Sequence, residues 1–231
     1  MKLKWTMVVL GIMLLVSRVF AGEPTVLKSE KDRVNYSIGV NVINNFKQQD
    51  IGLDLNMVIK GMSDALAGDK LLLSDDELRA TLMEVQNKIR QKQRLGKRLS
   101  AMENKKEGDA FLVANKKQEG VVTLPSGLQY KVLSAGKGRK PTEVDTAVCQ
   151  YRTTLINGTE VDNSYDNNKP VAYKIKDGVI PGWREALLLM PLGSKWRLFV
   201  PSNLAYGSQG SGVIIGPNET LIFEIELLDI Q

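Results

Sequence analysis

Four glycines near the C-terminus have a spacing that could serve phosphate binding. The four are Gly207, Gly210, Gly212 and Gly216. A phosphate-binding loop lies between a strand and a helix whose N-terminus meets the anion. Here the pattern of a strand follows, "TLIFEIELL" (220–228), and residues 206–231 contain no lysine or arginine. We therefore expect a loop that folds tightly over an apolar site, with Val213, Ile214 and Ile215 at its tip.

Histidine is absent from the chain, and Cys149 is the single cysteine. These two facts exclude Ser-His-Asp and Cys-His catalysis, the usual zinc sites and an internal disulfide. Cys149 lies in the strand pattern "TAVCQYRTTL" with no basic partner beside it, so we expect a buried, inert thiol. We predict chemistry that uses no metal and no cofactor.

The chain has 231 residues, of which 43% are hydrophobic and 25% charged, and this balance is typical of globular proteins. Residues 1–21 are predicted to be a signal peptide, with Lys2 and Lys4 before the apolar run 5–16 and cleavage after Ala21. An uncleaved anchor is the alternative, and the short run argues against it. We expect an exported protein of the periplasm or of the outer membrane and cell surface.

Removal of residues 1–21 would lower the formal net charge from +5 to +2, since three basic residues and no acidic ones are lost. A nearly balanced charge argues against nucleic acid as a partner.

Residues 22–73 are predicted to form a small helical domain. One amphipathic helix is expected from about Ser29 to Gln49, and a second from about Asn56 to Ala67, with Gly68 as its stop. Two helices of this size cannot enclose a core by themselves. A second copy of the chain is the simplest cover for their apolar faces, so we predict a homodimer through residues 22–90.

A long connecting helix is predicted over residues 74–120. Ser74 and Glu77 form a capping box at its start, and no proline follows before Pro125. The alternatives are a disordered linker or two helices broken at Gly96 or Gly108. We favour one helix, because each internal glycine costs only about 1 kcal/mol.

Residues 121–231 are predicted to form an antiparallel α+β domain. The strand patterns are 128–133, 147–155, 171–175, 195–200 and 220–228. A short helix over 181–190 begins at Pro181, and Asn157-Gly158 indicates a tight turn. Many strands with one helix indicate an α+β fold.

Two segments of this domain resemble the FKBP-type peptidyl-prolyl cis-trans isomerases. They are "GVIPGWREALLLMPLGSKWRLFVPSNLAYG" and "IGPNETLIFEIELL". "EGVVTLPSGLQYKVLSAGKGRKP", "YSIGVNVINNF" and "GMSDALAG" resemble the bacterial two-domain branch, the macrophage infectivity potentiator type, so the resemblance covers the mature chain. It implies an N-terminal all-α dimerisation domain, the long connecting helix, and a curled antiparallel sheet around one short helix.

The resemblance also implies the site. The catalytic residues would be Asp162, Tyr206 and Trp183, and the substrate-binding residues Tyr151, Val161, Val179, Ile180, Ile215 and Phe223. Trp183 would form the floor under the proline ring, with Tyr151, Phe223 and Ile215 as walls. The Ile180 backbone and the Tyr206 hydroxyl would bind the peptide or a tacrolimus-like inhibitor. Core packing is the alternative for each aromatic residue, and for Phe223 the two readings stay open.

Prolyl isomerisation suits a site without histidine, because no covalent bond breaks. The bond rotates over a barrier of about 18–20 kcal/mol. Water favours the charge-separated planar amide, so a dry aromatic pocket favours the twisted state relative to it. Asp162 would orient polar groups and transfer no proton. Proline-containing unfolded or exported polypeptides are the expected substrates.

Three positions depart from the family pattern. Val161 stands where the family usually has an aromatic residue, Arg152-Thr153 replaces Thr-Gly, and Val171 replaces an aromatic wall of small members. We therefore predict reduced activity on short peptides. The rival function is a dimeric periplasmic chaperone or interaction protein with a weak isomerase site, and a role in virulence would rest on family analogy alone.

Overall fold

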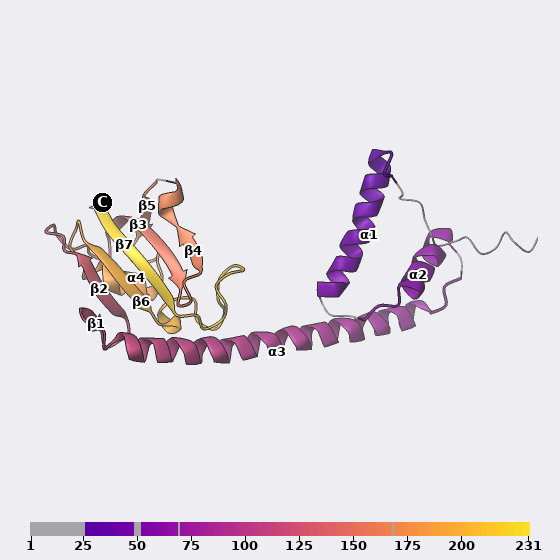
Figure 1. Cartoon of the computed structure of the whole chain (residues 1–231), viewed down its shortest axis with the longest axis horizontal. Coiled ribbons are helices and arrows are strands. Elements are labelled where there is room, and N and C mark those ends of the chain that lie inside the picture. Colours follow the sequence, from indigo (N-terminus) through magenta and orange to yellow (C-terminus); the bar gives the residue numbers. More distant parts are fainter. Residues whose placement is uncertain (1–25, 49–51, 69, 168) are drawn as a thin grey trace, which may run out of the picture. The chain divides into compact units, whose positions relative to one another are not determined.

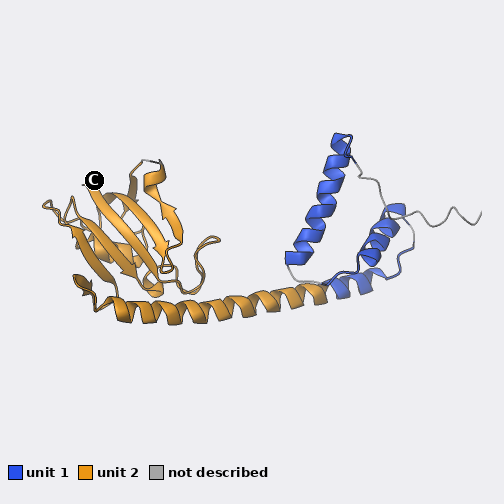
Figure 2. Cartoon of the chain, in the orientation of Figure 1, with its two compact units in different colours: residues 1–82 blue, residues 83–231 orange. Residues whose placement is uncertain are grey.

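A computed structural model describes residues 26–48, 52–68, 70–167 and 169–231. The chain divides into two compact units, residues 1–82 and residues 83–231 (Figures 1 and 2). The predicted signal peptide lies outside the described residues. Of the helices within the described ranges, none is long and apolar enough to cross a bilayer.

The first unit contains the two predicted short helices, α1 (Glu30–Gln48) and α2 (Leu55–Ala67). Ser29 caps α1, because its Oγ accepts a hydrogen bond from the Asp32 N–H at 3.1 Å and Asp32 accepts one in return from the Ser29 N–H. Asp54 caps α2, and Gly68 ends it in the left-handed conformation at φ 72°. No residue of α1 is buried.

Helix α3 (Asp75–Asn115) is continuous over 41 residues and passes through both Gly96 and Gly108. The predicted capping box is present, since the Ser74 N–H donates to Glu77 Oε2 at 2.8 Å and the Glu77 N–H to Ser74 Oγ at 3.4 Å. A break at either glycine and a disordered linker are both excluded. The helix ends four residues before Glu119, where a turn closed by Gln118 N–H to Asn115 O replaces the helical bonds.

The second unit contains a seven-stranded antiparallel sheet in the order β1-β2-β6-β7-β3-β4, with β5 paired to β3. Its strands are β1 (Val121–Thr123), β2 (Gln129–Ser134), β3 (Thr146–Leu155), β4 (Glu160–Asn163), β5 (Val171–Lys174), β6 (Lys195–Val200) and β7 (Leu221–Ile230). Two single turns of 3₁₀-helix follow β4 and β6, at Ser164–Asn167 and Ser202–Leu204. Five strands correspond to predicted ones, whereas β1 and β4 were not predicted.

One short helix, α4 (Pro181–Leu187), packs on the sheet and completes the predicted architecture (Figure 1). Alternate residues of β3 and β7 point inward, as expected of strands with one buried face. They meet the apolar side of α4, where Trp183, Ala186 and Leu187 are buried. Cys149 is fully buried in this core, as predicted, and burial raises its pKa to about 12.

Within the second unit, the last turns of α3 pack against the sheet. The Phe111 ring lies 5.9 Å from that of Phe199, measured between centroids. Asn115 Nδ2 donates to Gln129 Oε1 at 2.9 Å, and Gln129 Nε2 donates to the Leu112 carbonyl at 2.9 Å. This part of the helix therefore belongs to the same compact unit as the sheet.

Candidate active site

A cavity of about 600 Å³ opens between α4, the inner face of the sheet and the loop after β6. All nine residues predicted for the site line it: Tyr151, Val161, Asp162, Val179, Ile180, Trp183, Tyr206, Ile215 and Phe223. They come from β3, β4, the segment before α4, α4 itself, the glycine-rich loop and β7. The fold therefore gathers residues that are 72 positions apart in the sequence.

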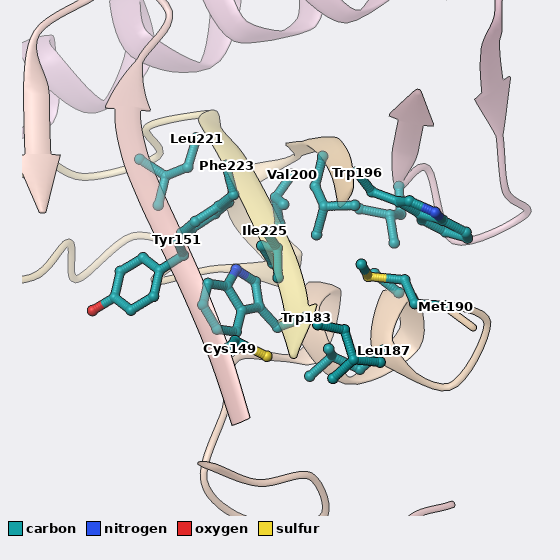
Figure 3. Close-up of a cluster of buried hydrophobic side chains, with 14 of the residues drawn as sticks. Cys149, Tyr151, Trp183, Leu187, Met190, Trp196, Val200, Leu221, Phe223 and Ile225 are labelled. Atoms are coloured by element: carbon teal, nitrogen blue, oxygen red, sulfur yellow. The ribbon is translucent and has the colours of Figure 1, made fainter. Parts of the chain in front are cut away.

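Trp183 lies at the centre of a group of aromatic rings. The rings of Tyr151, Tyr173 and Phe223 stand nearly perpendicular to the indole, with centroids 5.0, 5.6 and 5.4 Å from it. Figure 3 shows Tyr151, Trp183 and Phe223 side by side, with the Tyr151 hydroxyl directed out of the cluster. Such edge-to-face contacts are favourable and fix the ring planes. The indole is 4% exposed, so it forms a rigid, apolar floor.

The start of α4 explains why Trp183 is held so firmly. Pro181 occupies the first turn of the helix, where its missing N–H costs nothing. A Cβ at Gly182 would lie 2.6 Å from Val200 Cγ1 and 3.3 Å from the Leu204 carbonyl oxygen. Only glycine lets the helix approach β6 this closely. Because of this close approach, the side chain of the next residue, Trp183, lies in the core.

Asp162 and Tyr151 form the polar edge of the cavity. The Tyr151 hydroxyl donates to Asp162 Oδ2 at 2.5 Å, and the Tyr173 hydroxyl lies 3.3 Å from the Tyr151 hydroxyl. Burial, and then the hydrogen bond to Asp162, raises the pKa of Tyr151 well above its usual range. Tyr151 therefore stays protonated and holds the carboxylate as a hydrogen-bond donor.

Two hydrogen-bonding groups at the cavity are available to a ligand. Among the described residues, the Ile180 N–H has no hydrogen-bond partner, whereas its carbonyl accepts from the N–H groups of Trp183 and Arg184. Tyr206 is 39% exposed. Burial raises the pKa of its hydroxyl, and repulsion of a Tyr206 phenolate by an ionised Tyr173 and by the Asp162 carboxylate raises this pKa further. A phenol that remains protonated can donate to a carbonyl oxygen.

The glycine-rich loop forms a small hairpin beside the cavity. The Ser211 N–H donates to the Ile215 carbonyl at 2.9 Å, and the Ile215 N–H to the Ser211 carbonyl at 3.2 Å. Gly210 has φ 69°, and a Cβ there would lie 2.3 Å from the Ile215 oxygen, so this turn requires glycine. Val213 and Ile214 lie at the exposed tip as predicted. Ile215 was also expected at the tip, but its side chain is buried.

The structure adds one aromatic residue that the sequence reasoning missed. Val171, expected as a wall position, does not line the cavity but borders an adjacent hollow that shares Tyr151 and Asp162. Tyr173, two residues further along β5, lines the cavity instead. Residues two apart share one face of a strand, so the alternation of β5 was the signal that could have indicated it.

Comparison with known proteins agrees with the fold and the cavity. Residues 31–132 match the family of domains amino-terminal to FKBP-type peptidyl-prolyl isomerases. Residues 137–228 match the FKBP-type peptidyl-prolyl cis-trans isomerases. The chain therefore belongs to the FKBP-type peptidyl-prolyl cis-trans isomerases.

The relatives identify the branch. Outer membrane protein MIP of Legionella longbeachae is 42% identical over all of this chain and 99% of its own. Peptidyl-prolyl cis-trans isomerase Mip of Coxiella burnetii is 41% identical over 90% of each chain. The crystal structure of FkpA from Escherichia coli superposes with a TM-score of 0.71 at 36% identity, over 89% of this chain and 99% of that one. The activity is thus peptidyl-prolyl isomerisation of the Mip and FkpA type.

Proposed function

We propose that isomerisation takes place in the cavity floored by Trp183, with the prolyl ring of the substrate on the indole. The observation that carries this proposal is that Trp183 and Tyr206 line the same cavity. Trp183 provides its apolar floor, and Tyr206 provides a hydroxyl donor at its edge. Tyr151, Phe223 and Ile215 act as walls, and Val161 and Val179 complete the apolar lining. The Ile180 N–H and the Tyr206 hydroxyl bind carbonyl groups of the peptide.

The rate enhancement comes from the difference between the solvation of the planar and the twisted amide. In water the planar amide gains from hydration of its charge-separated form, and this gain is lost when the bond twists. The aromatic floor provides no such hydration, so transfer from water to the cavity costs the planar amide more solvation free energy than it costs the twisted amide. Asp162 is held by Tyr151 at 2.5 Å, so it orients polar groups and transfers no proton.

Conservative substitutions of the polar groups test this assignment. Tyr206→Phe and Asp162→Asn keep the shape of the cavity and should lower kcat/KM for a proline-containing peptide by about tenfold, the effect of about 1.4 kcal/mol in the transition state. Tyr165→Phe is the control, because its hydroxyl contacts Glu226 at 3.3 Å and it does not line the cavity. Unchanged kcat/KM in both site variants would refute the assignment.

Binding of tacrolimus gives a second test that is independent of turnover. Trp196 stacks on Tyr130 away from the cavity, at 4.3 Å between ring centroids, so Trp196→Phe leaves Trp183 as the reporter in the second unit. Filling the cavity should change the Trp183 fluorescence and saturate with one ligand per chain. A titration without a fluorescence change would argue against ligand contact with the indole.

Val161 provides less contact area than an aromatic residue, so turnover of short peptides should lie below that of typical family members. Tyr173 offsets part of this loss, because its ring packs on Trp183. Assay of the purified mature protein decides the point, and turnover at the usual family level would contradict it.

The biological role we propose is assisted folding of exported proteins by a homodimer formed through residues 22–90. Support comes from apolar side chains on α1 and α2 that are half or more exposed, which include Val34, Tyr36, Ile38, Met57, Ile59 and Met62. Sedimentation should give twice the chain mass, and Ile38→Asp with Ile59→Asp should give the monomer mass. Equal masses for the two proteins would exclude this interface.

Holding of unfolded chains by the dimer is the second function. Apolar side chains of α3 outside the dimer interface favour it, since Leu95, Leu99 and Met102 are more than half exposed, and two such surfaces in one dimer would add avidity. Asp162→Asn with Tyr206→Phe separates the two roles in an aggregation assay. Protection that survives in this variant belongs to holding, whereas protection that is lost with the isomerase activity belongs to the cavity.

A further inference from the structure

Helix α3 contacts the chain where the glycine-rich loop rejoins β7. Asn104 Nδ2 donates to the Pro217 carbonyl at 2.9 Å, and Asn218 Nδ2 donates to the Ala101 carbonyl at 3.1 Å. The two bonds run in opposite directions between the same two segments. All four residues belong to one compact unit. We call residues 207–216 the flap, and Pro217 with Asn218 the flap base.

Asn218 joins both ends of the flap to the helix. Its backbone N–H donates to the Gly207 carbonyl at 2.8 Å, which closes the flap as a loop. Its φ of 59° is the only positive value of a non-glycine residue in the described part of the chain. Asparagine tolerates this conformation better than most residues do, but the conformation still costs free energy. The bond from its side chain to Ala101 helps to offset that cost.

The flap forms one side of the cavity. Residues 211–215 line the cavity, and Tyr206 immediately precedes the flap. The tip is unsupported, since Val213 is fully exposed and Ile214 is half exposed. The position of the flap therefore depends on its own Ser211–Ile215 pair, on the buried side chain of Ile215 and on its base. The base in turn is held by α3.

We infer that Asn104 and Asn218 are positioning residues through which helix α3 sets the flap over the catalytic cavity. The inference rests on the proposed site, because the flap matters for turnover only if substrate binds there. A free loop would sample open positions, and a fraction of molecules would lack the complete cavity wall. Apparent substrate affinity falls in proportion to the competent fraction, so the effect appears in KM rather than in kcat.

The same helix offers a matched control. Asn115 also donates its Nδ2 to a partner in the second unit, Gln129 at 2.9 Å, but this bond lies at β2, and neither residue lines the cavity. Asn104→Ala and Asn115→Ala therefore each remove one amide bond between α3 and the sheet domain. Only Asn104→Ala loosens the flap base.

Amide exchange and steady-state kinetics on the full mature chain test the inference. In Asn104→Ala the amide protons of Ser211, Ile215 and Asn218 should exchange about fivefold faster, the change that one ordinary hydrogen bond produces. KM for a proline peptide should rise two- to fivefold with kcat unchanged. Asn115→Ala should leave the exchange of these three amides and KM at their original values. Unchanged exchange in Asn104→Ala, or equal changes in both variants, would overturn the inference.

A second variant guards against an indirect effect of Asn104→Ala. Asn218→Gly keeps the left-handed backbone without strain and removes only the bond to Ala101, so it should also raise KM and speed exchange. Because both bonds hold one base, the double variant should fall short of the product of the two single effects. Independent, multiplicative effects would contradict a shared clamp.

The outcome for the flap can be separated from the outcome for the site. If the reaction occurs elsewhere, Tyr206→Phe retains its turnover while Asn104→Ala still accelerates exchange in the flap. If the clamp is wrong, Tyr206→Phe loses turnover while Asn104→Ala exchanges at the original rate.

Discussion

Gly108 and Gly96 lie in the same helix, yet alanine should have opposite effects at the two positions. A Cβ at Gly108 would lie 2.3 Å from Thr220 Oγ1 and 3.1 Å from Thr220 Cβ, and Thr220 is 3% exposed. At Gly96 nothing lies within 4 Å of the new methyl group. Alanine gains about 1 kcal/mol over glycine in a helix interior at either position. At Gly108 the overpacking costs about 1–3 kcal/mol.

The neighbouring contacts add to the cost at Gly108. Movement of the helix away from Thr220 would strain the bonds of Asn104 and Asn218, each worth about 1 kcal/mol. We therefore expect Gly108→Ala to lower the free energy of unfolding by about 1–3 kcal/mol and Gly96→Ala to leave it unchanged or raise it by up to about 1 kcal/mol.

Urea unfolding of the two variants, followed by tryptophan fluorescence, measures the difference. Trp183 and Trp196 are both buried in the second unit, so the signal reports this unit. A Gly108→Ala variant as stable as Gly96→Ala would refute the close packing of α3 against Thr220.

Two further predictions concern single groups. Because the pKa of Cys149 is about 12, only about one thiol in 10⁴ is ionised at pH 8. A disulfide reagent should therefore modify this buried thiol only as fast as the second unit unfolds. Rapid labelling under native conditions would contradict its burial. Burial, followed by the charge of Glu107, raises the pKa of Glu219 above its ordinary 4.5. The contribution of Glu219 to stability is therefore present below pH 4.5 and is lost as the pH rises through the higher folded value. Glu219→Gln should accordingly melt at a higher temperature than the original protein at pH 7 and show no advantage at pH 4, and a constant difference at both pH values would contradict this reasoning.

The helices were predictable because their ends carry local signals. Ser29 and Ser74 cap the N-termini of α1 and α3, and Gly68 ends α2. Each of these signals involves residues at most four positions apart, so it is visible in the sequence. The end of α3 was placed too late, because no comparable signal follows Asn115. There a turn and the tertiary bond of Asn115 to Gln129 end the helix.

The strands divide along the same line. Long strands such as β3 and β7 show the alternation of a half-buried sheet, whereas β1 has three residues and β4 has four. β1 is too short to show a period, and β4 has a single apolar residue, Val161, so the pairing of these strands with β2 and β3 fixes them. Asp162 lies on β4 and was identified by resemblance to the family rather than by pattern.

The contacts around the flap had no local signal at all. Asn104 and Pro217 are 113 residues apart, and both residue types are ordinary for a helix and a loop. Tyr173 is different, since it could have been inferred from the alternation along β5. The unpredicted part of the site therefore consists of residues whose roles depend on contacts between distant parts of the sequence and not on a local motif.

The bonds between α3 and the flap base have a consequence for any molecule that occupies the cavity. Thermodynamic linkage is reciprocal, so if the docked helix strengthens ligand binding, the bound ligand must tighten the docking of the helix by the same factor. A ligand in the cavity would then slow amide exchange of α3 near Ala101, a residue that does not line the cavity. Occupancy of the proposed isomerase cavity would in this way change the stability of a helix that begins in the other compact unit.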